Sequence, residues 1–135
     1  MSILKFSHVM HIGSEVSSKI KRGLDAVDAV DSVLPAGTLS GAPKLRAMEI
    51  IDELEDNRRG IYGGGIGYID LAGNLDISIA IRLAYAKNGR VYIRSGAGIV
   101  ADSVPEKEDA ECKNKARAVM AALERSGGDG NGAAD

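Results

Sequence analysis

The sequence has no tryptophan, one phenylalanine and four tyrosines, so aromatic residues contribute only 4% of its 135 residues. Its single cysteine, Cys112, cannot form a disulfide within the chain, which fits a reducing compartment. No apolar run approaches the roughly 18 residues that a membrane-spanning helix requires. The N-terminus lacks the basic start, apolar stretch and small-residue cleavage site of a secretory signal. These absences predict a cytoplasmic protein that does not act on a membrane.

Neither positive nor negative charge is in large excess. A net charge of -2 and a pI near 5.7 argue against a nucleic-acid surface, which needs a strong positive patch. The hydrophobic share of 44% and the charged share of 27% are typical of a soluble globular chain, and the length suits one domain. The 17 glycines are unusual, and because glycine loses most conformational freedom on folding, so many require a reason.

The spacing of apolar residues predicts an α+β fold, with helices packed on one side of an antiparallel sheet. We expect helices over 24–34, 43–55 and 103–125, the last begun by a capping box of Ser103 and Glu106. We expect extended segments over 4–12, 16–20, 61–70, 75–86 and 91–95. The last three are expected to form one meander, with Asn88-Gly89 as a hairpin turn. Residues 35–44 are too rich in glycine and proline for a regular element, and we expect one domain over 1–125 and a disordered tail over 126–135.

Three alternating glycines, Gly63, Gly65 and Gly67, are expected on one face of the strand over 61–70. Glycines inside a strand indicate that a ligand or another part of the protein approaches the backbone closely, and both interpretations stay open. Tyr62 and Tyr68 are expected on the opposite face, where their hydroxyls could donate to a ligand.

Arg82 is expected in the middle of a strand, on a face of small or polar residues. Its guanidinium has five fixed donors, which suit a bidentate contact with a carboxylate. The alternatives are a solvated sheet face or an ion pair with Asp76.

Glu108, Glu111 and Lys115 share one face of the last predicted helix, because they are spaced three and four residues apart. Their carboxylates could hold Mg²⁺, which takes one or two protein carboxylates and keeps other oxygen ligands, or they could form an exposed salt-bridge face. His8 and His11 are expected on opposite faces of a strand, so they are no obvious metal pair. Either could be a general acid or base, or a structural hydrogen-bonding residue.

Two glycine-containing segments resemble nucleotide-binding loops without meeting their requirements. The segment 37–44 has Pro43 before Lys44, where a phosphate loop needs glycine. The segment 96–101 has the spacing of a dinucleotide fingerprint but follows a hairpin strand rather than opening a helix in a βαβ unit.

Several strings taken together resemble the chorismate-utilising enzymes. They are HVMH at 8–11, PAGTLSGAPK at 35–44, RAMEIIDELE from Arg46, SGAGIVADSVP at 95–105 and NKARA at 114–118. The resemblance covers about residues 5–124 and corresponds to the C-terminal part of the family's chains. TLSGAPK and the string from Ser95 are most similar to those of anthranilate synthase large subunits.

The resemblance implies a larger two-sheet fold, a Mg²⁺ requirement and a glutaminase partner subunit that supplies ammonia. In the implied reaction, ammonia adds to C2 of chorismate, the C4 hydroxyl leaves, and pyruvate is eliminated to give anthranilate. Two further interpretations stay open: another chorismate enzyme, either aminodeoxychorismate or isochorismate synthase, or a non-catalytic chain that self-associates through its strand edges.

The resemblance also implies roles for individual residues. Tyr62, Arg82 and the backbone of Gly96, Ala97 and Gly98 match substrate-binding positions; Glu111 matches a metal ligand, with Glu108 beside the metal; His11, Thr38 and Lys115 match catalytic positions.

Overall fold

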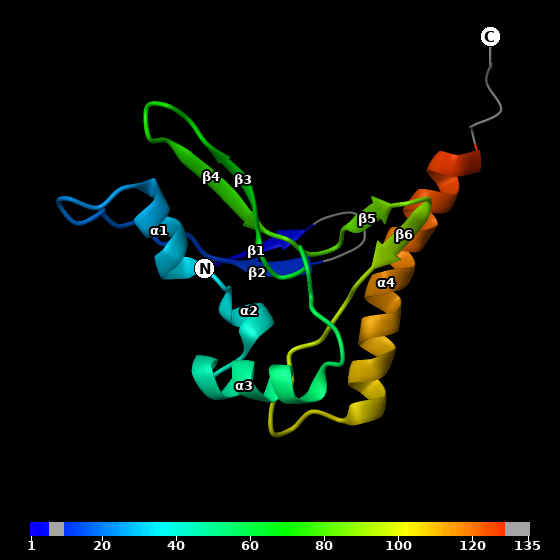
Figure 1. The fold of residues 1–135 in the computed structure, drawn as a ribbon. Helices are drawn as coiled ribbons and strands as arrows, with labels where there is room; N and C mark the ends of the chain where they lie inside the picture. Colours follow the sequence, from blue (N-terminus) through cyan, green and yellow to red (C-terminus); the bar gives the residue numbers. More distant parts are fainter. Residues whose placement is uncertain (6–9, 129–135) are drawn as a thin grey trace, which may run out of the picture.

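The computed structural model describes residues 1–5 and 10–128, which form an α+β arrangement (Figure 1). Its strands are β1 (Ser2–Lys5), β2 (Met10–Gly13), β3 (Gly65–Ile69), β4 (Leu75–Ile79), β5 (Ala84–Lys87) and β6 (Arg90–Ile93). Its helices are α1 (Ala26–Val33), α2 (Gly37–Ser40), α3 (Lys44–Leu54) and α4 (Pro105–Gly128). The α+β class predicted from the sequence is therefore confirmed.

Helices α1 and α3 lie where the apolar spacing predicts them. The N-cap of α1 is Asp25, whose carboxylate accepts hydrogen bonds from the backbone N–H groups of Val27 and Asp28, at 2.8 and 3.2 Å. The Asp28 side chain in turn accepts from the backbone N–H of Asp25, at 2.8 Å. This reciprocal capping box satisfies donors that have no partner inside the helix.

The glycine- and proline-rich segment before α3 is more regular than predicted. It contains the single-turn helix α2, whose last residue, Ser40, is buried and donates its hydroxyl to the carbonyl oxygen of Ala36 at 3.2 Å. The Lys44 ammonium donates to the carbonyl oxygen of Pro35 at 2.8 Å. These bonds satisfy the polar groups of the segment locally, so its composition does not prevent a helical turn.

The strands form three separate two-stranded antiparallel ladders, β1–β2, β3–β4 and β5–β6. The predicted single strand over 75–86 is wrong, because the chain leaves the extended conformation between β4 and β5, where Arg82 has a φ of 53°. Its first half pairs with β3 and its second half with β6, so the predicted three-stranded meander becomes two hairpins. The turn at Asn88-Gly89 is confirmed, with φ values of 52° and 71°.

The strand glycines are placed differently from the prediction. Gly63 precedes β3 and has a φ of 86°, so only Gly65 and Gly67 lie in the strand. A Cβ added to Gly67 would lie 2.0 Å from the carbonyl oxygen of Asp76, and one added to Gly65 would lie 2.5 Å from Cδ1 of Ile77. The protein itself therefore makes the close approach at these two positions, which supports the packing interpretation.

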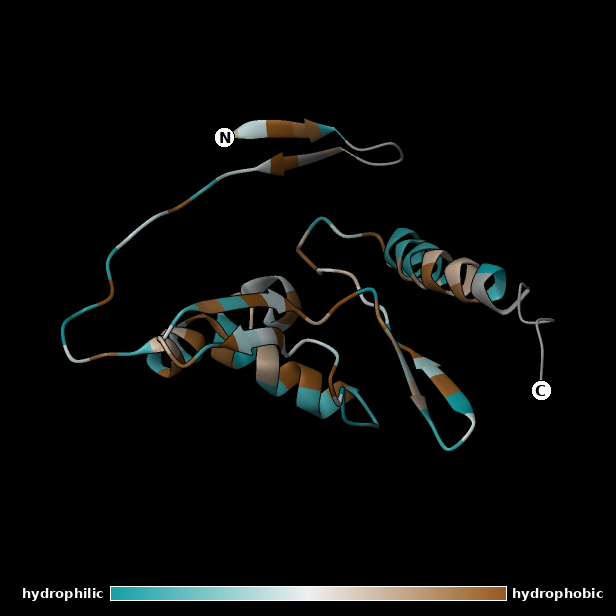
Figure 2. Ribbon diagram, turned by 90° about the horizontal axis from the view of Figure 1, so that it is seen from above, coloured by the Kyte–Doolittle hydropathy of each residue, from teal (hydrophilic) through white to brown (hydrophobic). Residues whose placement is uncertain are grey.

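The N-terminal strand predicted over 4–12 is instead the hairpin β1–β2, with Leu4 opposite His11. No strand forms over 16–20. The prediction for His8 lies outside the described residues. Figure 2 shows the β1–β2 hairpin apart from the other elements, joined to α1 by an extended segment.

Helix α4 begins at Pro105, two residues after the predicted cap. The Ser103 hydroxyl accepts from the backbone N–H of Val100 at 3.0 Å, and the carbonyl oxygen of Val104 accepts the first helical bonds. Proline suits the first helical position because its missing N–H has no partner there. The helix extends to Gly128, so three residues of the predicted tail are helical, and the rest of that prediction lies outside the described residues.

Little apolar surface is removed from water in the part of the chain that is described. There, the buried apolar residues are Ala26, Tyr62 and Ala80, and large side chains along β3 and β6, such as Ile66 and Tyr92, are more than half exposed. Figure 2 shows hydrophobic residues along these open hairpins. Over the same residues, no helix combines the length and apolarity that crossing a membrane requires.

Candidate functional site

The break between β4 and β5, the segment after β6 and one face of α4 enclose a hollow of about 190 Å³. Six of the predicted site residues line it: Thr38, Tyr62, Arg82, Gly96, Gly98 and Lys115. A larger open hollow of about 770 Å³ along α4 shares Arg82 and Lys115 and adds Glu111. The fold thus brings together residues that are up to 77 positions apart, from Thr38 to Lys115.

Lys115 is one of the residues that line both hollows. Its Nζ lies 2.6 Å from Oε1 of Glu111, one helical turn earlier, and donates to the carbonyl oxygen of Gly96 at 3.1 Å. The ammonium therefore ties α4 to the segment after β6. The Ser95 hydroxyl makes a second tie by donating to the carbonyl oxygen of Cys112 at 2.7 Å.

Tyr62 lies at the floor of the smaller hollow and is 9% exposed. A Cβ added to Gly96 would lie 3.1 Å from the Tyr62 hydroxyl oxygen, so the tyrosine and the glycine backbone are in close contact. A side chain at position 96 would push on the hydroxyl. Glycine at this position therefore allows the Tyr62 hydroxyl to lie directly against the backbone.

Arg82 reaches the hollows from the strand break, where its backbone adopts the left-handed region. Within residues 1–5 and 10–128 its guanidinium has no ion pair, so the alternative pairing with Asp76 is not formed. An unpaired guanidinium beside Lys115 makes the hollow electropositive and suited to an anion that carries carboxylates.

Three predicted site residues lie elsewhere or outside these hollows. Ala97 and Glu108 are not among the lining residues of either hollow, although Glu108 lies one turn before Glu111 on α4. The strand that carries His11 lies apart from the elements around the hollows (Figure 2). Among the described residues, no three His, Cys, Asp or Glu side chains are grouped so that they could hold a metal ion.

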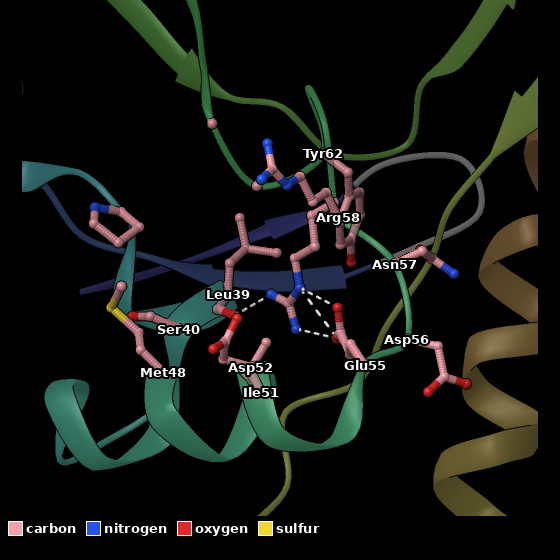
Figure 3. A pocket seen from close by; sticks show the side chains of 14 residues that line it. Leu39, Ser40, Met48, Ile51, Asp52, Glu55, Asp56, Asn57, Arg58 and Tyr62 are labelled. Atoms are coloured by element: carbon pink, nitrogen blue, oxygen red, sulfur yellow. Dashed lines mark hydrogen bonds and ion pairs between the residues drawn. The ribbon is translucent and has the colours of Figure 1, made fainter.

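A cluster of two arginines around one carboxylate adjoins the site and was not predicted from the sequence. Glu55, at the C-cap of α3, accepts from Nη2 of Arg59 at 2.6 Å and from Nη2 of Arg94 at 2.5 Å. Each side chain is less than a third exposed. Arg59 also donates to the carbonyl oxygen of Leu39 at 2.7 Å, and its guanidinium carbon lies 6.0 Å from the ring centroid of Tyr62. Figure 3 shows the bonds to Glu55 and Leu39 at the wall of a neighbouring cavity of about 620 Å³.

The hydrogen bond from Arg59 and the positive charges of Arg59 and Arg94 lower the pKa of Glu55, while partial burial acts in the opposite direction. The same bond raises the pKa of Arg59. Glu55 is therefore ionised in the folded chain at neutral pH, and the cluster carries a net positive charge.

This lowered pKa predicts how stability depends on pH. We expect Glu55→Gln to reduce the free energy of unfolding by about 2 kcal/mol at pH 7, because it leaves two guanidiniums without their carboxylate. The ionised carboxylate stabilises the fold fully above the unfolded pKa of about 4.3, so the difference between the proteins should stay constant down to that pH. It should shrink as the pH falls through the lower folded pKa. Urea unfolding from pH 7 to pH 3 measures this; a difference that already shrinks near pH 6 would contradict it.

A hollow lined by Arg82, Lys115 and glycine backbone has the charge and the donors that suit a small organic anion. Comparison with known proteins specifies the class further: residues 1–121 match the family described as chorismate binding enzyme. The chain therefore belongs to the chorismate binding enzymes, and its α+β hairpins and helices are part of that family's chorismate-binding domain.

Similar proteins include anthranilate synthase component 1 of three organisms. The chain is 56% identical to that of Aquifex aeolicus over 124 residues, which are 92% of this chain and 25% of the relative. It is 57% identical to that of Acetivibrio thermocellus, over 94% of this chain and 26% of the relative. It is 58% identical to that of Thermococcus kodakarensis, over 90% of this chain and 28% of the relative. The chain thus spans about a quarter of the length of these relatives.

Proposed function

We propose that the chain carries the chorismate-binding part of an anthranilate synthase component 1. The observation that carries this proposal is 56–58% identity to proteins of that name over almost the whole chain. The proposed reaction converts chorismate and ammonia to anthranilate and pyruvate, a lyase reaction of tryptophan biosynthesis in the cytoplasm. The proposed partner is a glutaminase subunit, component 2, that supplies the ammonia.

The proposed substrate is a small dianion, and the smaller hollow offers donors that suit it. Arg82 and Tyr62 line this hollow; the guanidinium is proposed to hold one carboxylate in a bidentate contact, with the Tyr62 hydroxyl as a further donor. Gly96 and Gly98 line the same hollow and carry no side chains of their own, so their backbone N–H groups are proposed as further donors. Ala97 is proposed to contribute its backbone alone.

The chemistry of α4 fits a magnesium ion shared with the substrate rather than held by the protein alone. Mg²⁺ usually keeps several waters or substrate oxygens and takes only one or two protein carboxylates. Glu111, at the rim of the larger hollow and 52% exposed, is proposed as the ligand, with Glu108 beside it. When bound, the ion would neutralise the ring carboxylate of chorismate and polarise the ring for loss of the 4-hydroxyl.

Three further residues, Lys115, Thr38 and His11, are proposed to contribute a positive charge, a hydroxyl and an acid or base. Lys115 contributes a positive charge at the junction of the hollows, held in place by Glu111 and the Gly96 carbonyl. Thr38, in α2, lines the smaller hollow, and its hydroxyl is proposed to contact the substrate ring. His11 is proposed as an acid or base near the leaving groups.

Calorimetry of the purified chain with chorismate tests the proposal, with Mg²⁺ in one arm and EDTA in the other. We expect binding that is at least tenfold weaker in EDTA, because the ion offsets repulsion between Glu111 and the substrate carboxylates. Anthranilate fluorescence should stay far below the rate of a full-length relative, since the chain spans about a quarter of that length. Adding the rest of the Acetivibrio thermocellus protein as a second polypeptide should raise it.

The outcomes separate the alternatives. Aminodeoxychorismate or isochorismate as the product, identified by mass, would favour another chorismate enzyme. Absence of binding heat together with oligomers in sedimentation would favour a non-catalytic, self-associating chain and overturn the proposal.

A further inference from the structure

One carboxylate, Glu55, is bonded to both arginines that connect the separate segments of the candidate site. We propose that Glu55 is a positioning residue, which holds three walls of the substrate cavity in register through Arg59 and Arg94. The inference rests on the proposed function for the identity of the ligand. The contacts of Glu55 with Arg59 and Arg94 do not depend on that identity.

The first two walls are held by Arg59. Its Nη1 donates to the carbonyl oxygen of Leu39 at 2.7 Å, and Leu39 follows Thr38 in α2. Its guanidinium also lies against the ring of Tyr62, three residues further along the chain. Glu55 receives both Nε and Nη2 of this arginine, at 3.0–3.1 Å and 2.6 Å. This fork fixes the plane of the guanidinium and hence the direction of its third donor.

The third wall is held by Arg94. Its Nη2 donates to Oε2 of Glu55, and its Nη1 donates to Oδ1 of Asn57 at 2.6 Å and to the carbonyl oxygen of Arg58 at 3.2 Å. Arg94 directly precedes Ser95 and Gly96, whose backbone lines the hollow. The position of this segment therefore depends on the C-terminal end of α3.

Partial burial strengthens the bonds by which Glu55 couples Arg59 to Arg94. The three side chains are 27–29% exposed, so water competes weakly for their hydrogen bonds. Removing the central charge leaves both guanidiniums without their shared acceptor, and each is then free to leave its second partner. By contrast, Glu53 on the same helix is 59% exposed, and within the described part of the chain its side chain bonds Arg46 alone. Glu53→Gln is therefore a matched control.

Hydrogen exchange of the full chain at pH 7, without ligand, tests the inference directly. We expect Glu55→Gln to accelerate exchange about tenfold in the hydrogen-bonded amides of 38–41 and 59–64 and in β6, which leads into 94–98, with the β3–β4 hairpin unchanged. Arg94→Lys should loosen β6 alone, and Arg59→Lys should loosen 38–41 and 59–64 alone. Glu53→Gln should change none of them. Glu55→Asp keeps the negative charge on a shorter side chain, so it should be less protected than the unchanged chain and more protected than Glu55→Gln. If Glu55→Gln does not fold, Glu55→Asp is compared with the unchanged chain instead.

Chorismate calorimetry with Mg²⁺ supplies the second readout. Glu55→Gln should weaken binding about tenfold although Glu55 lines a neighbouring cavity rather than the proposed one. If the unchanged chain does not bind chorismate, the proposed function fails and the exchange pattern still decides the positioning role. Equal loosening of every element by all three cluster variants, or none, would overturn the role itself.

Discussion

Replacing Arg82 with alanine is expected to weaken chorismate binding about 100-fold, equivalent to roughly 3 kcal/mol for a charge-assisted bidentate contact. Arg82 lines both hollows and has no ion pair among the described residues, so the substitution removes no internal bond of the fold. Calorimetry in Mg²⁺ buffer measures the loss. The far-ultraviolet circular dichroism spectrum should stay the same.

Arg90→Ala is the matched control for Arg82→Ala. It removes the same charge from the neighbouring β6 strand, where Arg90 is exposed and pairs across the hairpin with Lys87. We expect a change in affinity of less than about threefold, since Arg90 lines neither hollow and would act on a bound anion only through water. Equal losses for both variants would reduce the effect to general electrostatic attraction and remove Arg82 from the site.

Gly67→Ala is expected to destabilise the fold by about 3 kcal/mol, the upper end of the usual cost of overpacking. The added Cβ would lie 2.0 Å from the Asp76 carbonyl oxygen and 2.6 Å from Cα of Ile77, both backbone atoms of the paired strand β4. No side-chain rotation relieves this clash, so the β3–β4 ladder must separate or shift. Urea unfolding followed by circular dichroism measures the change.

Gly64→Ala is the matched control, because it measures the effect of a glycine-to-alanine change on stability without a backbone clash. An added Cβ there would lie 3.5 Å from the Ile61 carbonyl oxygen, which is an ordinary van der Waals contact. We expect its unfolding midpoint to stay near that of the unchanged chain. A Gly67→Ala midpoint equal to that of Gly64→Ala would show that β3 and β4 are not paired in this register.

The sequence predicted those parts of the fold that depend on neighbouring residues. Helix α1 follows from apolar spacing and a local cap, and the β5–β6 turn follows from Asn88-Gly89. The break at Arg82 was not predictable in this way, because the alternation of apolar and polar residues continues through it. Nothing in an arginine indicates a positive φ, so the division of one strand into two hairpins depends on tertiary structure.

The candidate site likewise combines residues that were predicted from the sequence with a cluster that was not. Residue chemistry and family resemblance pointed to Arg82, Tyr62 and Lys115, and the structure places all three on one hollow. The Glu55 cluster was missed, although Glu55 and Arg59 have the spacing of a helical ion pair, because such pairs are usually solvated and weak. What makes this pair different is Arg94, which is 39 residues further along the chain.

At position 82, the backbone conformation favours one kind of residue and the proposed side-chain contact favours another. Glycine or asparagine adopts this conformation at little cost, whereas a long side chain with a Cβ is held there at about 1 kcal/mol. Folding alone would therefore be served better by a smaller residue. The proposed contact between the Arg82 guanidinium and a substrate carboxylate would explain why an arginine stands at this corner between two hairpins in spite of the conformational cost. If so, replacing Arg82 by glycine should raise the stability of the chain while it weakens the binding of chorismate.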